Sequence, residues 1–389
     1  MAFNLSNLLA SLDSSIAALD SASELLEVLQ AINATNPTKG HGKSQRKYYA
    51  SVADLPAADS SLRGMVTVVS TSKVDSANGL YLCTGTSWTE IQDLDSAIPP
   101  TQAQGSNFGY TSGGLPPGAP PYYNVIDKFS LTSDGNATDV GDLTVGRGAP
   151  AGQSSSTNGY SSGGGIAPSV SPVSVNVIDK FPFVSDGNAS DVGDLTVGRY
   201  GAAGQSSTVS GYTSGGFPTT DVIDKFPFSS DANATDVGNL TAARFLGGGQ
   251  SSTENGYTSG GISSNVIDKF SFTSDANATD VGDLTAARYG PAGQNSAENG
   301  YTSGGANPLF NVIDKFPFAS DANATDVGDI TTARNTNAGQ SSTVSGYTSG
   351  GGVPGSSNII DKFPFASDAN ATDVGDLTVA RRYVAGQQY

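Results

Sequence analysis

The sequence predicts a mainly β protein whose larger part folds as a six-bladed β-propeller, and three observations lead to this fold class. The block Ile-Asp-Lys-Phe occurs six times, at spacings of 44 to 52 residues. An arginine follows the aspartate of each block after 20 residues. The repeated region begins and ends in the middle of a unit. Repeats of about 45 residues with four short strands are typical of propeller blades, and closure of a ring explains the two incomplete ends.

The first predicted element is a helical segment over residues 1–35. Its apolar residues recur in 4-3-4-3 steps, as in a coiled-coil seam, and the capping box Ser21-Ala22-Ser23-Glu24 opens a second helix. We expect this segment to form a homo-oligomer, with a trimer favoured, or to dock onto a larger assembly. The alternative is a helical hairpin packed against its own chain. The residues predicted to make these contacts are Leu5, Leu9, Leu12, Ile16, Leu19, Leu25, Leu29 and Ile32.

A basic linker, a small β-rich module and a second linker are expected to follow. Residues 36–47 combine Pro and Gly with a cluster of Lys, Arg and His. Residues 48–92 contain strand-like runs near 65–70 and 80–84. Residues 93–102 include Pro99 and Pro100, and would join the module to a propeller over residues 103–389.

Each unit of the propeller is expected to hold four antiparallel strands, a to d. One copy of each is strand a over 151–155, strand b over 211–216, strand c over 311–318 and strand d over 281–288. β-Branched and aromatic residues bounded by Gly, Asn, Asp and Ser support this interpretation. Residues 109–114 are a strand b without a well-matched strand a, and 382–389 contain a strand a without a strand b. The C-terminal strand is therefore predicted to complete blade one, which leaves no open edge in the ring.

Three polar positions of the repeat are expected to be structural. Because neighbours cover both faces of a blade, the charged side chains of strands c and d should be paired, as a buried Asp–Arg or Asp–Lys contact repeated in each blade. A glutamine six residues after each arginine either rings the central channel or bonds between blades. The aspartates and arginines are Asp127, Arg147, Asp179, Arg199, Asp224, Arg244, Asp268, Arg288, Asp314, Arg334, Asp361 and Arg381. The glutamines are Gln153, Gln205, Gln250, Gln294, Gln340 and Gln387.

Composition argues against several classes of protein. The chain has 36 Asp+Glu against 19 Lys+Arg, a net charge of −17, which gives no broad footprint for nucleic acid. One Cys and one His exclude an internal disulfide framework and a multi-histidine metal site. No apolar run is long enough to insert into a membrane. No blade contains His or Cys, and nearly every blade carboxylate belongs to the repeat, so we predict no enzymatic activity, catalytic residue, metal or cofactor.

The turn Asp-x-Asn-x-Thr-Asp leaves one alternative open. Asp231, Asn233, Thr235 and Asp236 form one copy and offer oxygen ligands in a calcium-like spacing. Asx-turns explain the same residues, since the sixth-position Gly and a bidentate Glu of a calcium loop are absent. The Asn of this turn opens an Asn-Ala-Thr or Asn-Ala-Ser sequon in all six blades, which duplication of a single turn explains.

The blades differ mainly in the connections between strands b and c. These connections should emerge on one face with the d–a connections, where rigid loops that present aromatic rings suit recognition of a sugar or a protein. The alternative is loop variation without function, with the aromatic rings covering the blade tips. The predicted receptor-binding residues are Tyr122, Tyr123, Asn124, Tyr200, Phe217, Phe245, Tyr289, Phe310 and Tyr383.

The repeat resembles two kinds of known protein. The Gly-Gly that ends strand b, the Asp of strand c and the Arg that ends strand d are similar to a kelch propeller blade. Near-identical blades joined to a small N-terminal module, with Gly79-Leu80-Tyr81, Gly85 and Trp88, resemble tail-fibre and other virion appendage proteins of bacteriophages, notably those of cyanobacteria.

The second resemblance implies a non-enzymatic virion appendage in the tail, neck or capsid, made in the host cytoplasm. Its N-terminal part would contact other virion proteins, and its propeller would bind a host surface glycan or protein. A purely structural decoration of head, neck or tail and a polysaccharide-active enzyme are the two alternatives.

Overall fold

A computed structural model describes residues 66–69, 79–83, 88–93, 105, 107–118, 121–166 and 173–389 of the chain. The chain divides into two compact units, Met1–Pro99 and Pro100–Tyr389. The predicted helical segment, with Leu5, Leu9, Leu12, Ile16, Leu19, Leu25, Leu29 and Ile32, lies outside the described residues, as does the linker 36–47.

The first unit contains a three-stranded antiparallel sheet in the order β1-β2-β3. Its strands are Val66–Val69, Gly79–Cys83 and Trp88–Asp93. The first two strands coincide with the runs predicted near 65–70 and 80–84.

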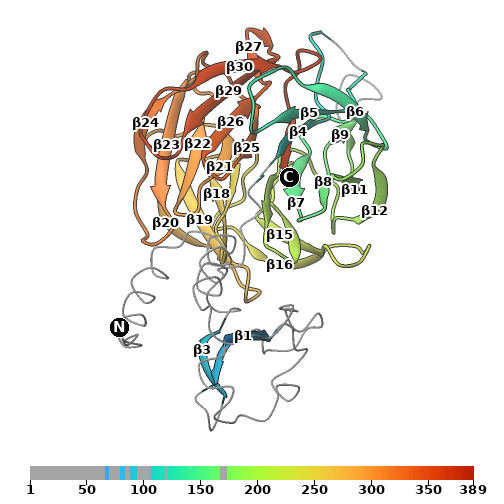
Figure 1. Cartoon of the computed structure of the whole chain (residues 1–389). Helices are drawn as coiled ribbons and strands as arrows, with labels where there is room; N and C mark the ends of the chain where they lie inside the picture. Colours follow the sequence, from blue (N-terminus) through green and yellow to red (C-terminus); the bar gives the residue numbers. More distant parts are fainter. Residues whose placement is uncertain are drawn as a thin grey trace. The chain divides into compact units, whose positions relative to one another are not determined.

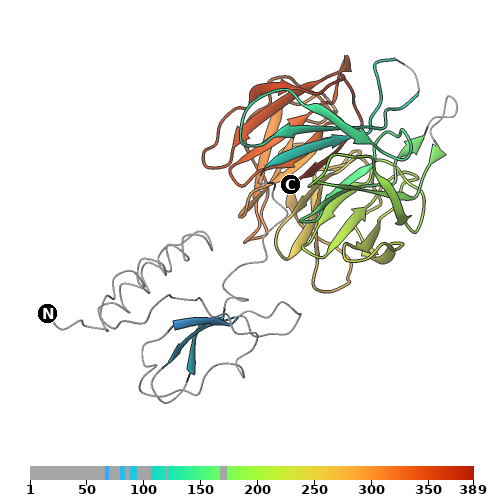
Figure 2. The ribbon, with the colours of Figure 1, turned by 45° about the vertical axis from the view of Figure 1, so that its right-hand side comes forward.

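The second unit is a ring of six four-stranded antiparallel sheets, which confirms the six-bladed β-propeller (Figures 1 and 2). The described residues contain no helix. From the axis outwards each blade runs a, b, c, d. Strands a are β31 (Ala385–Gln388), β7 (Ala151–Ser154), β13 (Ala203–Ser206), β17 (Gly248–Ser251), β21 (Ala292–Asn295) and β25 (Ala338–Ser341). Strands b are β4 (Phe108–Ser112), β8 (Asn158–Ser162), β14 (Ser210–Ser214), β18 (Asn255–Ser259), β22 (Asn299–Ser303) and β26 (Ser345–Ser349).

The two outer strands of each blade contain the repeated Ile-Asp-Lys-Phe block and the turn that follows it. Strands c are β5 (Val125–Ser130), β11 (Val177–Pro182), β15 (Val222–Pro227), β19 (Val266–Ser271), β23 (Val312–Pro317) and β29 (Ile359–Pro364). Strands d are β6 (Thr138–Asp142), β12 (Ser190–Asp194), β16 (Thr235–Asn239), β20 (Thr279–Asp283), β24 (Thr325–Asp329) and β30 (Thr372–Asp376). Two short hairpins decorate b–c connections, and their strands are β9 (Gly165–Ile166), β10 (Val173–Ser174), β27 (Gly352–Val353) and β28 (Gly355–Ser356).

Closure of the ring by the C-terminus is confirmed. Strand β31 pairs with β4, with Ala385 opposite Ser112 and Gln388 opposite Gly109. The last strand of the chain is thus the innermost strand of blade one, and the sheet order is β31-β4-β5-β6.

Strand d is shorter than its sequence suggests. The prediction ran from Val281 to Arg288, whereas β20 ends at Asp283. The backbone turns inwards because Thr285 donates from its amide and its hydroxyl to Asp314 of the next blade. The turn also brings Arg288 to the same carboxylate.

Successive side chains of strand c point to opposite faces of the sheet, and this alternation determines which neighbouring blade each side chain contacts. In β15, Ile223 lies against Phe270 of the following blade. Phe226 projects from the other face and packs against Tyr160 and Ile178 of the preceding blade. Side chains two residues apart share a face of a strand, so Asp224 also faces the preceding blade.

The buried Asp–Arg contact expected from the sequence is therefore present in six copies, and each copy joins the arginine of one blade to the aspartate of the next. Arg199 reaches Asp224 of the next blade at 3.0 Å, and both side chains are buried. Burial lowers the pKa of Arg199, and the Asp224 carboxylate opposes that shift. Breaking such a pair leaves a buried charge unpaired, which costs about 3–5 kcal/mol. The six pairs are Arg147–Asp179, Arg199–Asp224, Arg244–Asp268, Arg288–Asp314, Arg334–Asp361 and Arg381–Asp127.

The repeated glutamines bond between blades, which decides between the two roles left open. Gln205 Nε2 donates to Tyr257 O of the next blade at 2.9 Å and to Ser214 Oγ of its own blade at 2.9 Å. Ser214 and Thr258 add a hydroxyl contact of 2.7 Å across the same interface. Blade two has Ser161 where the others have Thr, and its buried hydroxyl makes no hydrogen bond.

Glycines allow the inner strands to approach one another at the axis. A Cβ added at Gly204 would overlap the carbonyl oxygen of Gly152, and one at Gly249 would overlap that of Gly204. The same contact recurs around the whole ring. Its members are Gly152, Gly204, Gly249, Gly293, Gly339 and Gly386.

Candidate binding face

The b–c and d–a connections lie on one face of the propeller, which we call the loop face. Isolated antiparallel bridges join them, such as Tyr200 to Phe217 and Tyr289 to Ala306. The opposite face, with the a–b and c–d turns, is called the turn face. The chain reaches the propeller on the turn face, where Gly105 N donates to Ser341 O at 2.8 Å, beside the a–b turn of blade six.

Six main-chain hydrogen bonds form a closed ring at the centre of the loop face. Each d–a connection contributes one residue with positive φ, between 53° and 66°. Each of these residues donates its N–H to the carbonyl of its counterpart in the neighbouring blade, at 2.5 to 2.8 Å. These bonds hold the backbone of the d–a connections, from which the surrounding side chains project. The members of the ring are Ala149, Gly201, Leu246, Gly290, Thr336 and Tyr383.

Around this ring the loop face is asymmetric. At the position before each ring residue, three consecutive blade interfaces carry Tyr200, Phe245 and Tyr289, whereas the other three carry Gly148, Asn335 and Arg382. The residues bridged to them also differ, since Phe217 lies opposite Tyr200 whereas Gly165 lies opposite Gly148. At these positions aromatic side chains are thus concentrated on one part of the face.

Five predicted residues on neighbouring blade interfaces are grouped here as the aromatic arc. The ring centroids of Tyr200 and Phe217 are 5.2 Å apart, and those of Phe217 and Phe245 are 5.3 Å apart. Tyr122 and Tyr383 both come within 3.7 Å of the position that a side chain at Gly148 would occupy. The arc comprises Tyr122, Tyr200, Phe217, Phe245 and Tyr383.

The tyrosines of the arc interact electrostatically. Burial raises the pKa of Tyr122, as does Tyr383, while Arg382 lowers it. Burial also raises the pKa of Tyr200, with further contributions from Tyr122 and Tyr383. The raised pKa values keep the phenols of Tyr122 and Tyr200 neutral, with both donor and acceptor capacity.

The remaining predicted residues lie outside the arc. The main chain of Tyr123 bonds to Gly114 and Arg147, and the carbonyl of Asn124 accepts from Leu143 N. An Asn or Asp makes the latter bond in every blade, so Asn124 belongs to the repeated framework. The ring of Phe310 lies 5.5 Å from the guanidinium of Arg288. Tyr289 is half-buried and bonds to Ala306 through its main chain.

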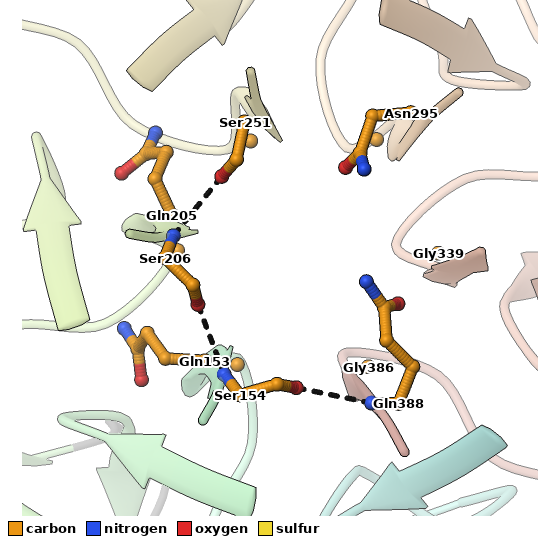
Figure 3. A pocket seen from close by; sticks show the side chains of 13 residues that line it. Gln153, Ser154, Gln205, Ser206, Ser251, Asn295, Gly339, Gly386 and Gln388 are labelled. Atoms are coloured by element: carbon orange, nitrogen blue, oxygen red, sulfur yellow. Dashed lines mark hydrogen bonds between the residues drawn. The ribbon is translucent and has the colours of Figure 1, made fainter. Parts of the chain in front are cut away.

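A small pocket opens at the axis on the turn-face side (Figure 3). Its polar rim links blade to blade, since Ser154 N donates to Ser206 Oγ at 2.9 Å and Gln388 N donates to Ser154 Oγ at 3.0 Å. These side chains are engaged with neighbouring blades in the contacts drawn in Figure 3.

The Asp- and Asn-rich turns are used for contacts between blades. Asp231 forms an ion pair with Lys180 of the preceding blade at 2.5 Å. Asn233 Oδ1 accepts from Asp194 N of that blade at 3.1 Å. Asp236 accepts from Gly238 N within its own strand. Among the described residues no group of three or more His, Cys, Asp or Glu is placed to hold a metal ion.

The comparisons with known proteins do not assign the chain to a family. No protein-family model matches the chain, and no curated protein matches it. The described part of the chain contains no helix that is long and apolar enough to cross a membrane.

Proposed function

We propose that this chain is a non-enzymatic attachment protein of a bacteriophage particle, in which the loop face of the propeller binds a receptor on the host surface. The observation that carries the proposal is the asymmetry of this face. Six closely similar interfaces support the ring, yet the residues that vary between blades gather aromatic side chains on one part of one face. Rigid loops with aromatic rings bind at a low cost in conformational entropy.

The path of the chain supports the same proposal. The chain enters the propeller on the turn face, opposite the loop face. Gly105 and the aromatic arc thus lie on opposite faces of the propeller, which suits attachment ahead of Gly105 together with binding through the arc. Several copies on one particle would multiply weak single contacts. The particle itself enters the proposal through the resemblance to virion appendage proteins.

The proposal is tested with the labelled full-length protein on a panel of intact bacteria that includes cyanobacteria. We expect saturable binding to a subset of strains. Phe217→Ala and Tyr122→Ala should each weaken binding about tenfold or more, as truncation of an aromatic anchor does. Phe217 is 39% exposed, so its replacement should leave the melting temperature nearly unchanged.

Val209→Ala is the matched control. Val209 is 66% exposed in an a–b turn, on the opposite face, and its variant should bind like the wild type. Wild-type binding by both arc variants would move the site elsewhere on the protein. Absence of saturable binding to any strain would favour a purely structural role.

A further inference from the structure

We propose that the receptor is an uncharged polysaccharide that lies across the aromatic arc. This inference rests on the proposed function and adds the chemical class of the ligand. It follows from the distribution of charge over the propeller together with the chemistry of the arc.

The loop face is almost without charge in a protein of net charge −17. Its b–c connections contain a single charged residue, Asp221. Its d–a connections contain the six arginines that are buried against strand c aspartates, and beyond them only Arg382. Asp221 and Arg382 have opposite charges, so the accessible part of the face has no net charge.

The carboxylates are concentrated on the outer strands and the turn face. Every strand d contains two aspartates, except β16, where Asn239 replaces the second. The lysines of strand c do not neutralise these residues, because each forms an ion pair with an aspartate in the c–d turn of the next blade. A negative rim therefore surrounds the neutral loop face.

This pattern selects against a polyanionic receptor. An acidic polymer on the loop face would meet one cation, Arg382, whose guanidinium already lies 5.8 Å from the ring of Tyr383. Segments of the polymer that extend past the face would pass the negative rim. Repulsion of like charges lowers both affinity and the rate of association with such a partner.

The arc has the groups that an uncharged sugar requires. The rings of Tyr200, Phe217 and Phe245 follow one another at 5.2 and 5.3 Å and present apolar faces to the C–H groups of a pyranose. The tyrosine hydroxyls at its other end can donate to and accept from sugar hydroxyls. No step of this recognition requires a charged group.

The test uses surface polysaccharide extracted from a strain that binds the full-length protein. An anion-exchange column separates it into a neutral and an acidic fraction, and each fraction competes with the labelled protein for intact cells. We expect competition by the neutral fraction alone. We also expect the Kd for that fraction to change less than twofold between 25 and 500 mM NaCl, whereas attraction between charges weakens steeply over such a range.

The outcomes separate this inference from the proposed function. Binding to cells that only the acidic fraction competes, or that weakens tenfold with salt, would overturn the neutral ligand while leaving a receptor-binding loop face. Binding that protease treatment of the cells removes would point to a protein receptor and overturn it equally. Failure of Phe217→Ala to weaken binding to the neutral fraction would place that ligand outside the arc. Absence of binding to any strain would remove both proposals.

Discussion

At the scale of the residue, the blades share one framework so closely that a departure from the repeat can be recognised by the contacts it lacks. Asn337 is such a departure. Its side chain is 6% exposed, and neither its amide nitrogen nor its amide oxygen has a hydrogen-bond partner. The same position in the other blades carries Pro150, Ala202, Gly247, Pro291 and Val384.

Replacement of Asn337 by Pro should therefore stabilise the protein. An unpaired buried amide costs about 1–3 kcal/mol, and proline already occupies this position after a positive-φ residue at Ala149 and Gly290. We expect Asn337→Pro to raise the free energy of unfolding by at least about 1 kcal/mol in urea denaturation. Ala202→Pro is the control, because it introduces proline without removing a polar group. An equal gain in both variants would assign the effect to proline alone.

At the scale of the element, strand a is specified by contact with its neighbour at the axis. A side chain at Gly249 would overlap Gly204 O, a main-chain atom that belongs to another strand of the ring. Neither atom can move without opening the ring, so the small residue is required by close approach and not by backbone conformation.

Gly249→Ala should therefore destabilise the propeller severely. We expect a loss of more than about 3 kcal/mol, in the range of the largest single-residue effects, measured by chemical denaturation. Gly187→Ala provides the matched control, since nothing lies within 4 Å of its added Cβ. Four other blades already carry Ala at that position, as at Ala232. A similar, small effect of both changes would show that the inner strands can separate.

The sequence was sufficient for the ring, the number of blades and the closing strand, since repeat length and the two incomplete ends determine these. It did not determine the partner of each aspartate. Asp179 lies 20 residues before Arg199, a spacing that is the same in all six blades, and 32 residues after Arg147, a spacing that ranges from 24 to 32 along the chain. The constant spacing does not mark the contact, because the structure pairs each aspartate with the arginine of the preceding blade. The direction in which the aspartate side chain leaves strand c decides which of the two arginines it contacts. The arc was predicted residue by residue, but Asn124 was not recognised as a framework position although Asn or Asp recurs there in every blade.

At the scale of the whole molecule, stability depends on the last eight residues. Strand β31 completes blade one, Gln387 donates to Tyr160 O of blade two at 2.9 Å, and Tyr383 closes the ring of main-chain bonds. Deletion of residues 382–389 removes all three connections at once.

We expect that deletion to abolish cooperative thermal unfolding. The open ring would expose the edge of β4 and leave blade one without the inner strand through which it contacts blades six and two. A synthetic peptide of residues 382–389, added in excess, should restore a cooperative transition. A melt of the shortened protein that matches the wild type would contradict closure as the source of stability.

The meeting of the first and last strands also determines how the propeller responds to mechanical load. Asn107 N and Phe108 N bond to Tyr389 O, and β4 then runs antiparallel to β31. A pull directed along the axis of β4 would shear several hydrogen bonds at once, on both sides of that strand, instead of opening them one after another. In the proposed attachment role, tension directed in this way would load the seam of the ring where these bonds resist it together.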